Sequence, residues 1–436
     1  KALHVGHLRN IAVGNGIAAV LKAGGSNVIQ QSQIGDMGRG MAEALAGYLH
    51  FGGGSTPRER GVKSDHFIGH LYRQYVATLS DEPINGASVD PALSREDIVV
   101  DDRASQLQWQ LQSGDATVTS LWNTARQWAM DGQQETLHRL TVDFDRILTE
   151  TDFVDHTAEL ERLALAQGIA RRVETGAVMY ETGEDHYPHL LLNRSDGLST
   201  AHLRHIALWW GMQPMLAGSH SILVMGNEWE PLSSYTERIL RTVTPPGHAI
   251  HPSTTVMHGM VTVGGEAVKS SRGDPLLIDE LLDQLIGRPE LHAVRSEHTR
   301  CDLDSIAVMT ALGAVLSHPL SKRLDLTFDQ LVSERSSAGW ALARAWADAW
   351  HPRHDGRPAP APGDLRYRYL VVQSQIHRGL VERAAQRLDP EPLVRFYAHL
   401  GRWYLEAEPS APVARLMRTI LGRGLGAMGL PAAPPV

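Results

Sequence analysis

The chain has 436 residues, of which 42% are apolar and 21% are charged. This balance is typical of a globular protein and excludes a disordered chain, a collagen-like chain and a coiled-coil rod. No segment approaches the roughly 18 consecutive apolar residues that span a bilayer, which excludes an integral membrane protein. The single cysteine, Cys301, excludes an intramolecular disulfide and favours a reducing, cytoplasmic location.

The formal net charge of −8 is unevenly distributed along the chain. Residues 300–436 carry a net charge of +4, and 16 of their 17 basic side chains are arginines, whereas residues 1–299 carry −12. This asymmetry is expected when only the C-terminal part meets a polyanion. A solvated, arginine-rich surface explains it equally, and on charge alone we favour that explanation. The chain opens at Lys1 in the middle of a motif, so we expect further residues upstream.

The first part of the chain alternates helical and strand patterns. Apolar residues at helical spacing predict an amphipathic helix from His7 to Lys22, ended by Gly24-Gly25. A second helix is predicted from Trp109 to Leu140. Short apolar runs predict strands at Val28–Ile34, Val173–Tyr180, Leu190–Asn193, Ile222–Met225 and Val256–Val263. Such alternation predicts a parallel α/β sheet.

After Leu276 the pattern becomes helical. Apolar residues recur at spacings of three and four, which predicts a helical bundle. The predicted helices are Ile278–Ile286, Ser305–Leu316, Phe328–Trp350, Tyr367–Leu388, Pro392–Glu406 and Ala414–Met428. The domain boundary is expected near residues 287–299, which gives domains of 1–290 and 291–436.

The histidine motif at the start of the chain can bind phosphate. His4-Val5-Gly6-His7 lies where the predicted first helix begins. A helix N-terminus offers unpaired N–H groups and a positive dipole end, and Gly6 lets a ligand approach the backbone. Two histidines that merely cap the helix are the alternative, and a four-residue motif alone favours it.

A basic loop follows the last predicted strand. Gly264-Gly265 precedes Lys269-Ser270-Ser271-Arg272, and the lysine and arginine side chains suit phosphate oxygens. An ordinary polar turn is the alternative for this segment alone. A third pattern, His66 and His70 at helical i,i+4 spacing, has no matching third metal ligand nearby, and we expect both on a solvated surface.

Together these motifs resemble the arginyl-tRNA synthetases of class I. The resemblance is carried by Lys1 to Arg9, by Gly35-Asp36-Met37-Gly38, by the Lys269 loop, and by Ser337-Ala338-Gly339-Trp340 in the helical part. It implies a Rossmann-like parallel-sheet catalytic domain with insertions, followed by an all-α anticodon-binding-type bundle. It also implies that the family's N-terminal tRNA-contacting domain and first strand would precede Lys1.

The resemblance implies a chemistry of amino-acid activation by ATP and Mg²⁺ and transfer to tRNA. His4 and His7 would bind the ATP phosphates and Lys269 the leaving pyrophosphate, with Lys1 compensating for Arg272, which stands where class I enzymes carry a second lysine. The implied nucleotide-binding residues are Gly6, Asn10, Gly226, Glu228, His258, Gly259, Met260, Ser270, Ser271 and Arg272. For Glu228 and Arg272 a packing role is equally favoured. No residue is assigned as a metal ligand.

The amino-acid site departs from the family pattern. Glu150 aligns with the family's guanidinium-binding glutamate, and Asp36 and Asn227 are the other implied substrate residues. The family's Tyr-x-x-x-Asp segment reads here with Ala201 at the tyrosine and His205 at the aspartate. Because one carboxylate is lost, the amino acid is predicted to be arginine, an analogue, or a smaller and less basic residue.

Three functions follow as hypotheses. The first is an arginyl-type aminoacyl-tRNA ligase, expected to be a monomer that binds tRNA through its arginine-rich bundle and does not bind a membrane. The second is a paralogue that makes an amide with a small amine or feeds the activated amino acid into a specialised biosynthetic pathway. The third is a non-catalytic tRNA-binding relative, which the combined presence of Lys1, His4, His7 and Lys269 argues against.

Overall fold

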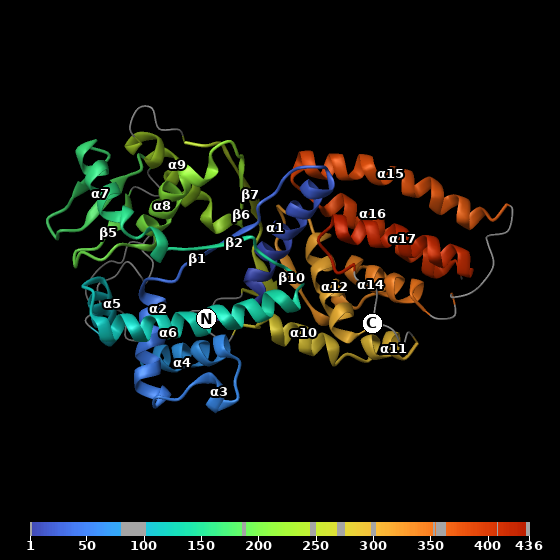
Figure 1. Cartoon of the computed structure of the whole chain (residues 1–436), viewed down its shortest axis with the longest axis horizontal. Coiled ribbons are helices and arrows are strands. Elements are labelled where there is room, and N and C mark those ends of the chain that lie inside the picture. Colours follow the sequence, from blue (N-terminus) through green and yellow to red (C-terminus); the bar gives the residue numbers. More distant parts are fainter. Residues whose placement is uncertain are drawn as a thin grey trace.

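A computed structural model describes residues 2–79, 102–184, 189–244, 250–267, 275–297, 302–351, 354, 363–407 and 409–432. Figure 1 shows an α/β half and a helical half side by side, with helix α1 (Val5–Ala23) between them. Within the described ranges, no helix combines the length and apolar character that crossing a membrane requires.

Helix α1 confirms the predicted first helix, but it is not amphipathic. Its buried residues, which include Leu8, Ala12, Val13 and Ile17, occupy more than one face. One face packs against the bundle helices α12 and α15, and another contacts strand β6. The helix is therefore a central element of the fold, which explains why apolar residues surround it.

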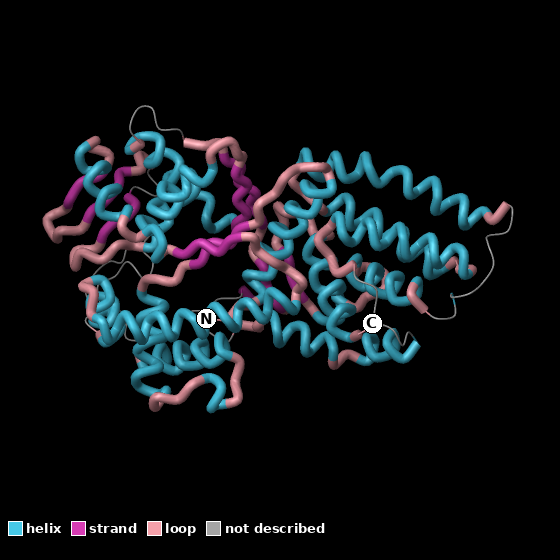
Figure 2. The backbone as a smooth tube through the Cα atoms, in the orientation of Figure 1, coloured by secondary structure: helices cyan, strands magenta, loops and turns pink. Residues whose placement is uncertain are grey.

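Parallel strand pairs confirm the predicted α/β class. Figure 2 shows the strands, in magenta, among the helices. The pairs are β1 (Gln31–Ile34) with β2 (Arg146–Thr149), β6 (Ser221–Gly226) with β7 (Ser253–His258), and β8 (Val261–Val263) with β10 (Leu324–Leu326). The predicted strand Val256–Val263 is wrong as a single element. Its backbone turns at Gly259, whose N–H donates to Leu320 O at 2.8 Å, and this splits it into β7 and β8.

A mixed insertion lies between β2 and β6. It contains the antiparallel strands β3 (Ala170–Arg172), β4 (Val178–Glu181) and β5 (His189–Asn193), and the helices α7 (His156–Ala166) and α8 (Ala201–Met212). Helix α9 (Glu230–Val243), which follows β6, packs against α7 and α8. These elements share one apolar core. The predicted strand Val173–Tyr180 is wrong at its start, where Val173 N–H donates to Ala177 O and Gly176 has a φ of 92° in a tight turn.

A helical insertion follows β1. Its helices are α2 (Arg39–Gly47), α3 (Pro57–Arg60), α4 (Ser64–Thr78), α5 (Arg103–Gln112) and α6 (Ala116–Arg139), which enclose a separate core. The predicted helix Trp109–Leu140 is two helices, because Gly114 takes a φ of 79° and Asp115 caps α6 by accepting from Val118 N–H.

A buried ionic cluster joins this helical insertion to α10 (Ile278–Ile286). Asp279 Oδ2 lies 2.8 Å from Lys63 Nζ, 3.2 Å from His66 Nε2 and 2.9 Å from Thr136 Oγ1. Desolvation alone would raise the pKa of Asp279, but hydrogen bonds from His66 and Lys63 hold it well below the usual range. The prediction that His66 lies on a solvated surface is therefore wrong, whereas His70 is exposed.

The C-terminal half is a helical bundle as predicted. After α10 come α11 (Pro289–Glu297), α12 (Leu303–Leu316), α13 (Phe328–Leu331), α14 (Ala338–Ala349), α15 (Leu365–Arg387), α16 (Glu391–Glu406) and α17 (Ala411–Ala427). The predicted helix Phe328–Trp350 is split, because Ser337 caps α14 by accepting from Trp340 N–H.

Close backbone contact sets the crossing of α12 and α14. A Cβ at Gly339 would lie 2.1 Å from Thr310 O, so only glycine permits this approach. One apolar core runs through α10, α12, α14 to α17 and also includes Val5, Leu8 and Ala12 of α1. Strand β10 follows α12 yet pairs with β8, so the sheet takes a strand from beyond residue 290. The predicted domain limits stay a prediction.

Candidate active site

The N-terminus of α1 fixes the two motif histidines. His4 caps the helix in an extended conformation, and its Nδ1 accepts from Gly6 N–H at 3.1 Å. His7 Nδ1 accepts from His4 N–H at 3.1 Å, and the two ring centroids are 3.9 Å apart. Since both Nδ1 atoms accept, the proton of each neutral ring resides on Nε2, which makes Nε2 a donor suited to phosphate oxygens.

Gly6 is required at this helix start. A Cβ there would lie 2.8 Å from His4 Cε1, so any side chain would displace the capping ring. The backbone N–H groups of the first turn donate within the protein: Val5 to Leu276 O, Gly6 to His4 Nδ1 and His7 to His4 O. An anion at this helix start would therefore be bound by the two imidazoles and by the positive end of the helix dipole.

The end of the basic loop returns to this helix start. Residues 268–274 lie outside the described part of the chain, and with them Lys269, Ser270, Ser271 and Arg272; Lys1 lies outside it as well. The residues that follow the loop contact the start of α1. Leu277 forms an antiparallel β-bridge with His4, and Val5 N–H donates to Leu276 O at 3.0 Å. The two motifs, about 265 residues apart, are thus joined through the backbone.

Arg9 connects α1 to the turn after β7. Its guanidinium is fully buried and donates to Gly259 O at 2.8 Å, Lys322 O at 2.7 Å and Pro319 O at 2.9 Å, with a longer contact to Leu320 O at 3.3 Å. Burial lowers the pKa of Arg9 to about 10, so it stays charged at neutral pH. Sequence reasoning gave Arg9 no role, although it stands two residues after the histidine motif.

Asn10 and His258 meet across the same junction. Asn10 Oδ1 accepts from His258 Nε2, and His258 Nδ1 lies 3.0 Å from Gly259 O. Desolvation by burial lowers the pKa of His258. Gly259 could not carry a side chain, because a Cβ would lie 2.5 Å from Lys322 O. Met260, which follows, is 50% exposed.

The end of β6 lies beside this junction. Gly226 is in register with His258 of β7, so the carboxyl ends of both strands stop at the same level. Asn227 and Glu228 follow in a short helical turn and are exposed. A Cβ at Gly226 would lie 2.3 Å from Glu228 Oε2, so this carboxylate folds back over the strand end. The predicted nucleotide residues thus gather where β6, β7 and α1 converge, the usual ligand position in parallel α/β folds.

The predicted amino-acid residues form a second group at the ends of β1 and β2. Glu150 follows β2 beside Gly35, and its Oε2 accepts from Arg204 Nε at 2.8 Å. Asp36 follows β1 and is buried; its Oδ1 accepts from Thr151 N–H at 3.0 Å, and its Oδ2 lies 2.9 Å from Arg126 Nε. Sequence reasoning missed both arginines. Arg204 stood within the compared segment, but no local signal marked Arg126.

Ala201 and His205 lie one helical turn apart on α8, so their side chains share a face. Desolvation, with a contribution from His202, lowers the pKa of His205 to about 4, which makes it neutral at physiological pH. The His205 ring centroid is 6.4 Å from that of Trp229, the residue after Glu228. Trp229 therefore connects the amino-acid group to the nucleotide group.

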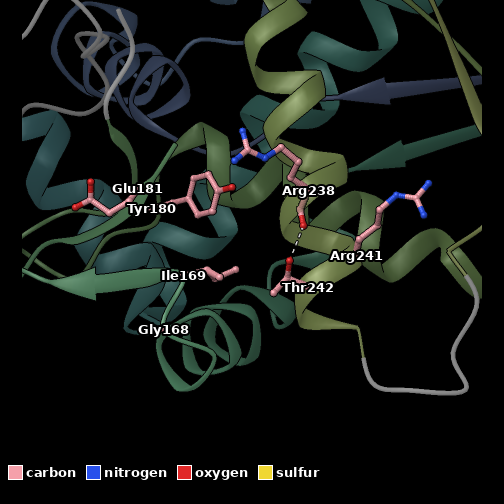
Figure 3. Close-up of a pocket in the computed structure, with 7 residues that line it drawn as sticks. All are labelled: Gly168, Ile169, Tyr180, Glu181, Arg238, Arg241 and Thr242. Atoms are coloured by element: carbon pink, nitrogen blue, oxygen red, sulfur yellow. Dashed lines mark hydrogen bonds between the residues drawn. The ribbon is translucent and has the colours of Figure 1, made fainter. Parts of the chain in front are cut away.

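A cavity of about 490 Å³ lies elsewhere, between β3, β4 and α9 (Figure 3). Its lining residues are Gly168, Ile169, Tyr180, Glu181, Arg238, Arg241 and Thr242. None of these is a predicted site residue. Across the described residues, no three His, Cys, Asp or Glu side chains are grouped as a metal site would require.

The fold is that of the class I tRNA synthetases. The sequence profile described as "tRNA synthetases class I (R), catalytic domain" matches residues 1–326. The chain therefore belongs to the arginyl-tRNA synthetase family, which confirms the resemblance seen in the sequence.

Curated relatives agree with this assignment. The chain is 29% identical to the arginine–tRNA ligase of Porphyromonas gingivalis over 297 residues, which is 66% of this chain and 48% of that protein. It is 25% identical to that of Borrelia duttonii over 346 residues, 76% of this chain and 56% of that protein. The chain thus spans about half the length of the curated relatives it matches.

The fold is similar to that of the Thermus thermophilus arginyl-tRNA synthetase, with a TM-score of 0.66 and 20% identity over 99% of this chain and 80% of that one. It is also similar to a Mycobacterium tuberculosis methionyl-tRNA synthetase in complex with methionyl-adenylate, with a TM-score of 0.53 and 12% identity over 98% of this chain and 89% of that one. These likenesses establish the fold.

Proposed function

We propose that this chain activates an amino acid with ATP and transfers it to tRNA, as an aminoacyl-tRNA ligase of the arginyl type, a term that here describes the fold and the reaction and not the amino acid. The observation that carries the proposal is the contact between the two motifs. Leu277, just after the basic loop, forms an antiparallel β-bridge with His4 at the start of α1. A site that pairs a helix N-terminus with a basic loop suits a triphosphate.

The reaction would proceed by attack of the amino-acid carboxylate on the α-phosphorus of ATP. A new O–P bond forms as the bond to the bridging oxygen breaks, and pyrophosphate leaves with the negative charge. His4 and His7 would donate to the phosphates, while Lys269, helped by Lys1 and Arg272, would stabilise the departing pyrophosphate. Mg²⁺ bound on the ATP phosphates supplies charge neutralisation. Ser270 and Ser271, in the same loop, would also bind the nucleotide.

The nucleoside would occupy the junction of β6, β7 and α1. A carboxylate at Glu228 can accept hydrogen bonds from both ribose hydroxyls, and Asn227 adds a donor next to it. Backbone groups of His258 and Met260 would contact adenine. Gly259, whose N–H donates to Leu320 O and whose O accepts from Arg9, would hold that turn in position. Gly6 and Gly226 would let the nucleotide approach the backbone closely, and Asn10 would hold His258 in position.

The bundle would bind tRNA. Residues 300–436 carry a net charge of +4 and are rich in arginine, which suits contacts to phosphates. We propose that the protein acts as a monomer.

The test is ATP–pyrophosphate exchange by the full chain, with a panel of amino acids, with and without bulk tRNA. Lys269→Ala should lower kcat by about 100-fold and change the KM for ATP far less, because its contact forms in the transition state. Lys22→Ala, an exposed lysine in the last turn of α1, is the matched control and should leave both parameters unchanged. Equal losses in kcat and ATP affinity, or no exchange under any condition, would contradict the proposal.

A second candidate is a paralogue that ligates the activated amino acid to a small amine. Ala201 and His205 in the amino-acid site favour it, because they alter what the site can recognise. Product analysis with a small amine in the absence of tRNA distinguishes the two functions. A non-catalytic tRNA-binding relative is the third candidate, and any amino-acid-dependent exchange would eliminate it.

A further inference from the structure

We infer that the amino-acid site of this chain is electrically balanced and selects an amino acid with an uncharged side chain instead of arginine. This inference rests on the proposed function, since it concerns the substrate of that same site. It is carried by two ion pairs that consume the site's carboxylates, together with the neutral and aromatic side chains beside them.

The first carboxylate is held by an arginine of the chain itself. Arg204 is 4% exposed, and its Nε donates to Glu150 Oε2 at 2.8 Å. Its Nη1 donates to Ser199 O at 2.5 Å, and Thr200 caps the helix beside it by accepting from Leu203 N–H. The guanidinium is therefore fixed at both ends, and Glu150 contributes no uncompensated charge to a substrate.

The second carboxylate, that of Asp36, is also paired with an arginine of the chain. Asp36 is 3% exposed, and its Oδ2 lies 2.9 Å from Arg126 Nε. Backbone and hydroxyl groups of Thr151 add hydrogen bonds of 3.0 Å and 2.6 Å to its two oxygens. Asp36 thus joins the strand ends to α6, and its charge is cancelled before any ligand arrives.

The other predicted residues of this site carry no charge. Ala201 has no polar group, and the lowered pKa of His205 keeps that ring uncharged at neutral pH. Trp229, 43% exposed, supplies an aromatic surface next to His205. A guanidinium that entered here would lose its hydration without gaining a free carboxylate, and this desolvation is costly. A neutral side chain avoids that cost.

The inference is tested by comparing arginine with citrulline, its uncharged isostere. Calorimetric titration of the full chain with each compound needs no turnover. The wild-type protein should not bind arginine more tightly than citrulline. Exchange assays should show at least about tenfold higher kcat/KM for the best uncharged amino acid than for arginine. Tighter arginine binding, or exchange driven best by arginine, would overturn the inference. Exchange by no amino acid would refute the proposed function, and the titration would still decide the charge preference.

Two variants create the missing negative charge by independent routes. His205→Asp adds a carboxylate, and Arg204→Gln releases the one at Glu150. Either should raise the preference for arginine over citrulline by about tenfold or more, as expected for a charge-assisted hydrogen bond. His205→Asn, which matches the aspartate in shape, is the control and should show no such gain. Melting temperatures identify a variant that fails to fold. An equal gain in the asparagine and aspartate variants would refute the electrostatic argument.

Discussion

Arg9 offers a direct test of how this fold holds its site together. Replacement by methionine keeps the length of the side chain and removes its hydrogen bonds to Gly259 O, Lys322 O, Pro319 O and Leu320 O. Each buried acceptor that loses its partner costs about 1–3 kcal/mol, and the loss is offset in part because a charge is no longer buried. We therefore expect Arg9→Met to lower the free energy of unfolding by about 3–5 kcal/mol.

The assay is urea unfolding of the full chain, followed by far-UV circular dichroism. Arg9→Lys should fall between wild type and Arg9→Met, because a single ammonium cannot span carbonyls on two loops. Lys22→Met, at the exposed end of the same helix, should change stability by no more than about 0.5 kcal/mol. If Arg9→Met cost less than about 1 kcal/mol, the assigned contacts would not stabilise the native fold.

Three further predictions concern single contacts. Asp279→Asn should lower the melting temperature at pH 7. The stabilisation by the Asp279 carboxylate is present above about pH 4 and is lost on protonation, so the difference from wild type should shrink as the pH falls through the depressed folded pKa. A difference that grows in acid would argue against this. Gly339→Ala should lower the free energy of unfolding by more than about 2 kcal/mol in chemical denaturation, because its Cβ would lie 2.1 Å from a backbone oxygen. Gly379→Ala, where the Cβ meets no atom within 4 Å, should raise it by up to about 1 kcal/mol. Equal effects would contradict the packing argument. Glu228→Gln should raise the KM for ATP about tenfold in the exchange assay. The control is Glu230→Gln, at an exposed position, which should leave the KM unchanged. An unaltered KM in the Glu228 variant would show that Glu228 does not bind the ribose.

The sequence predicted elements well where a local pattern decides them. The bounds of α10 coincide with the prediction, and α1 and α16 differ from it by one or two residues. The failures have local causes as well, since single capping residues such as Asp115 and Ser337 split runs whose apolar spacing continues across the break. Strand β10 has only three residues and depends on pairing with β8, which no local pattern reveals.

The site was predictable in part. Motif residues such as His4 and His7 are only three residues apart, so their pairing follows from the helix start they share. The partners of the charged groups were not predictable, because they arrive from distant segments. Arg9 and Gly259 are separated by 250 residues and Glu150 and Arg204 by 54, and only the tertiary fold brings each pair together.

The shared core around α1 limits how modular this protein can be. The helix that carries the histidine motif buries Val5 and Leu8 in the same apolar cluster as the bundle, and Asn15 Nδ2 donates to Gly429 O at 2.7 Å, near the far end of the described chain. A chimaera that joined this catalytic half to a foreign bundle would leave one side of α1 without complementary packing. We therefore expect a stable chimaera to take the histidine helix and the bundle from the same parent protein.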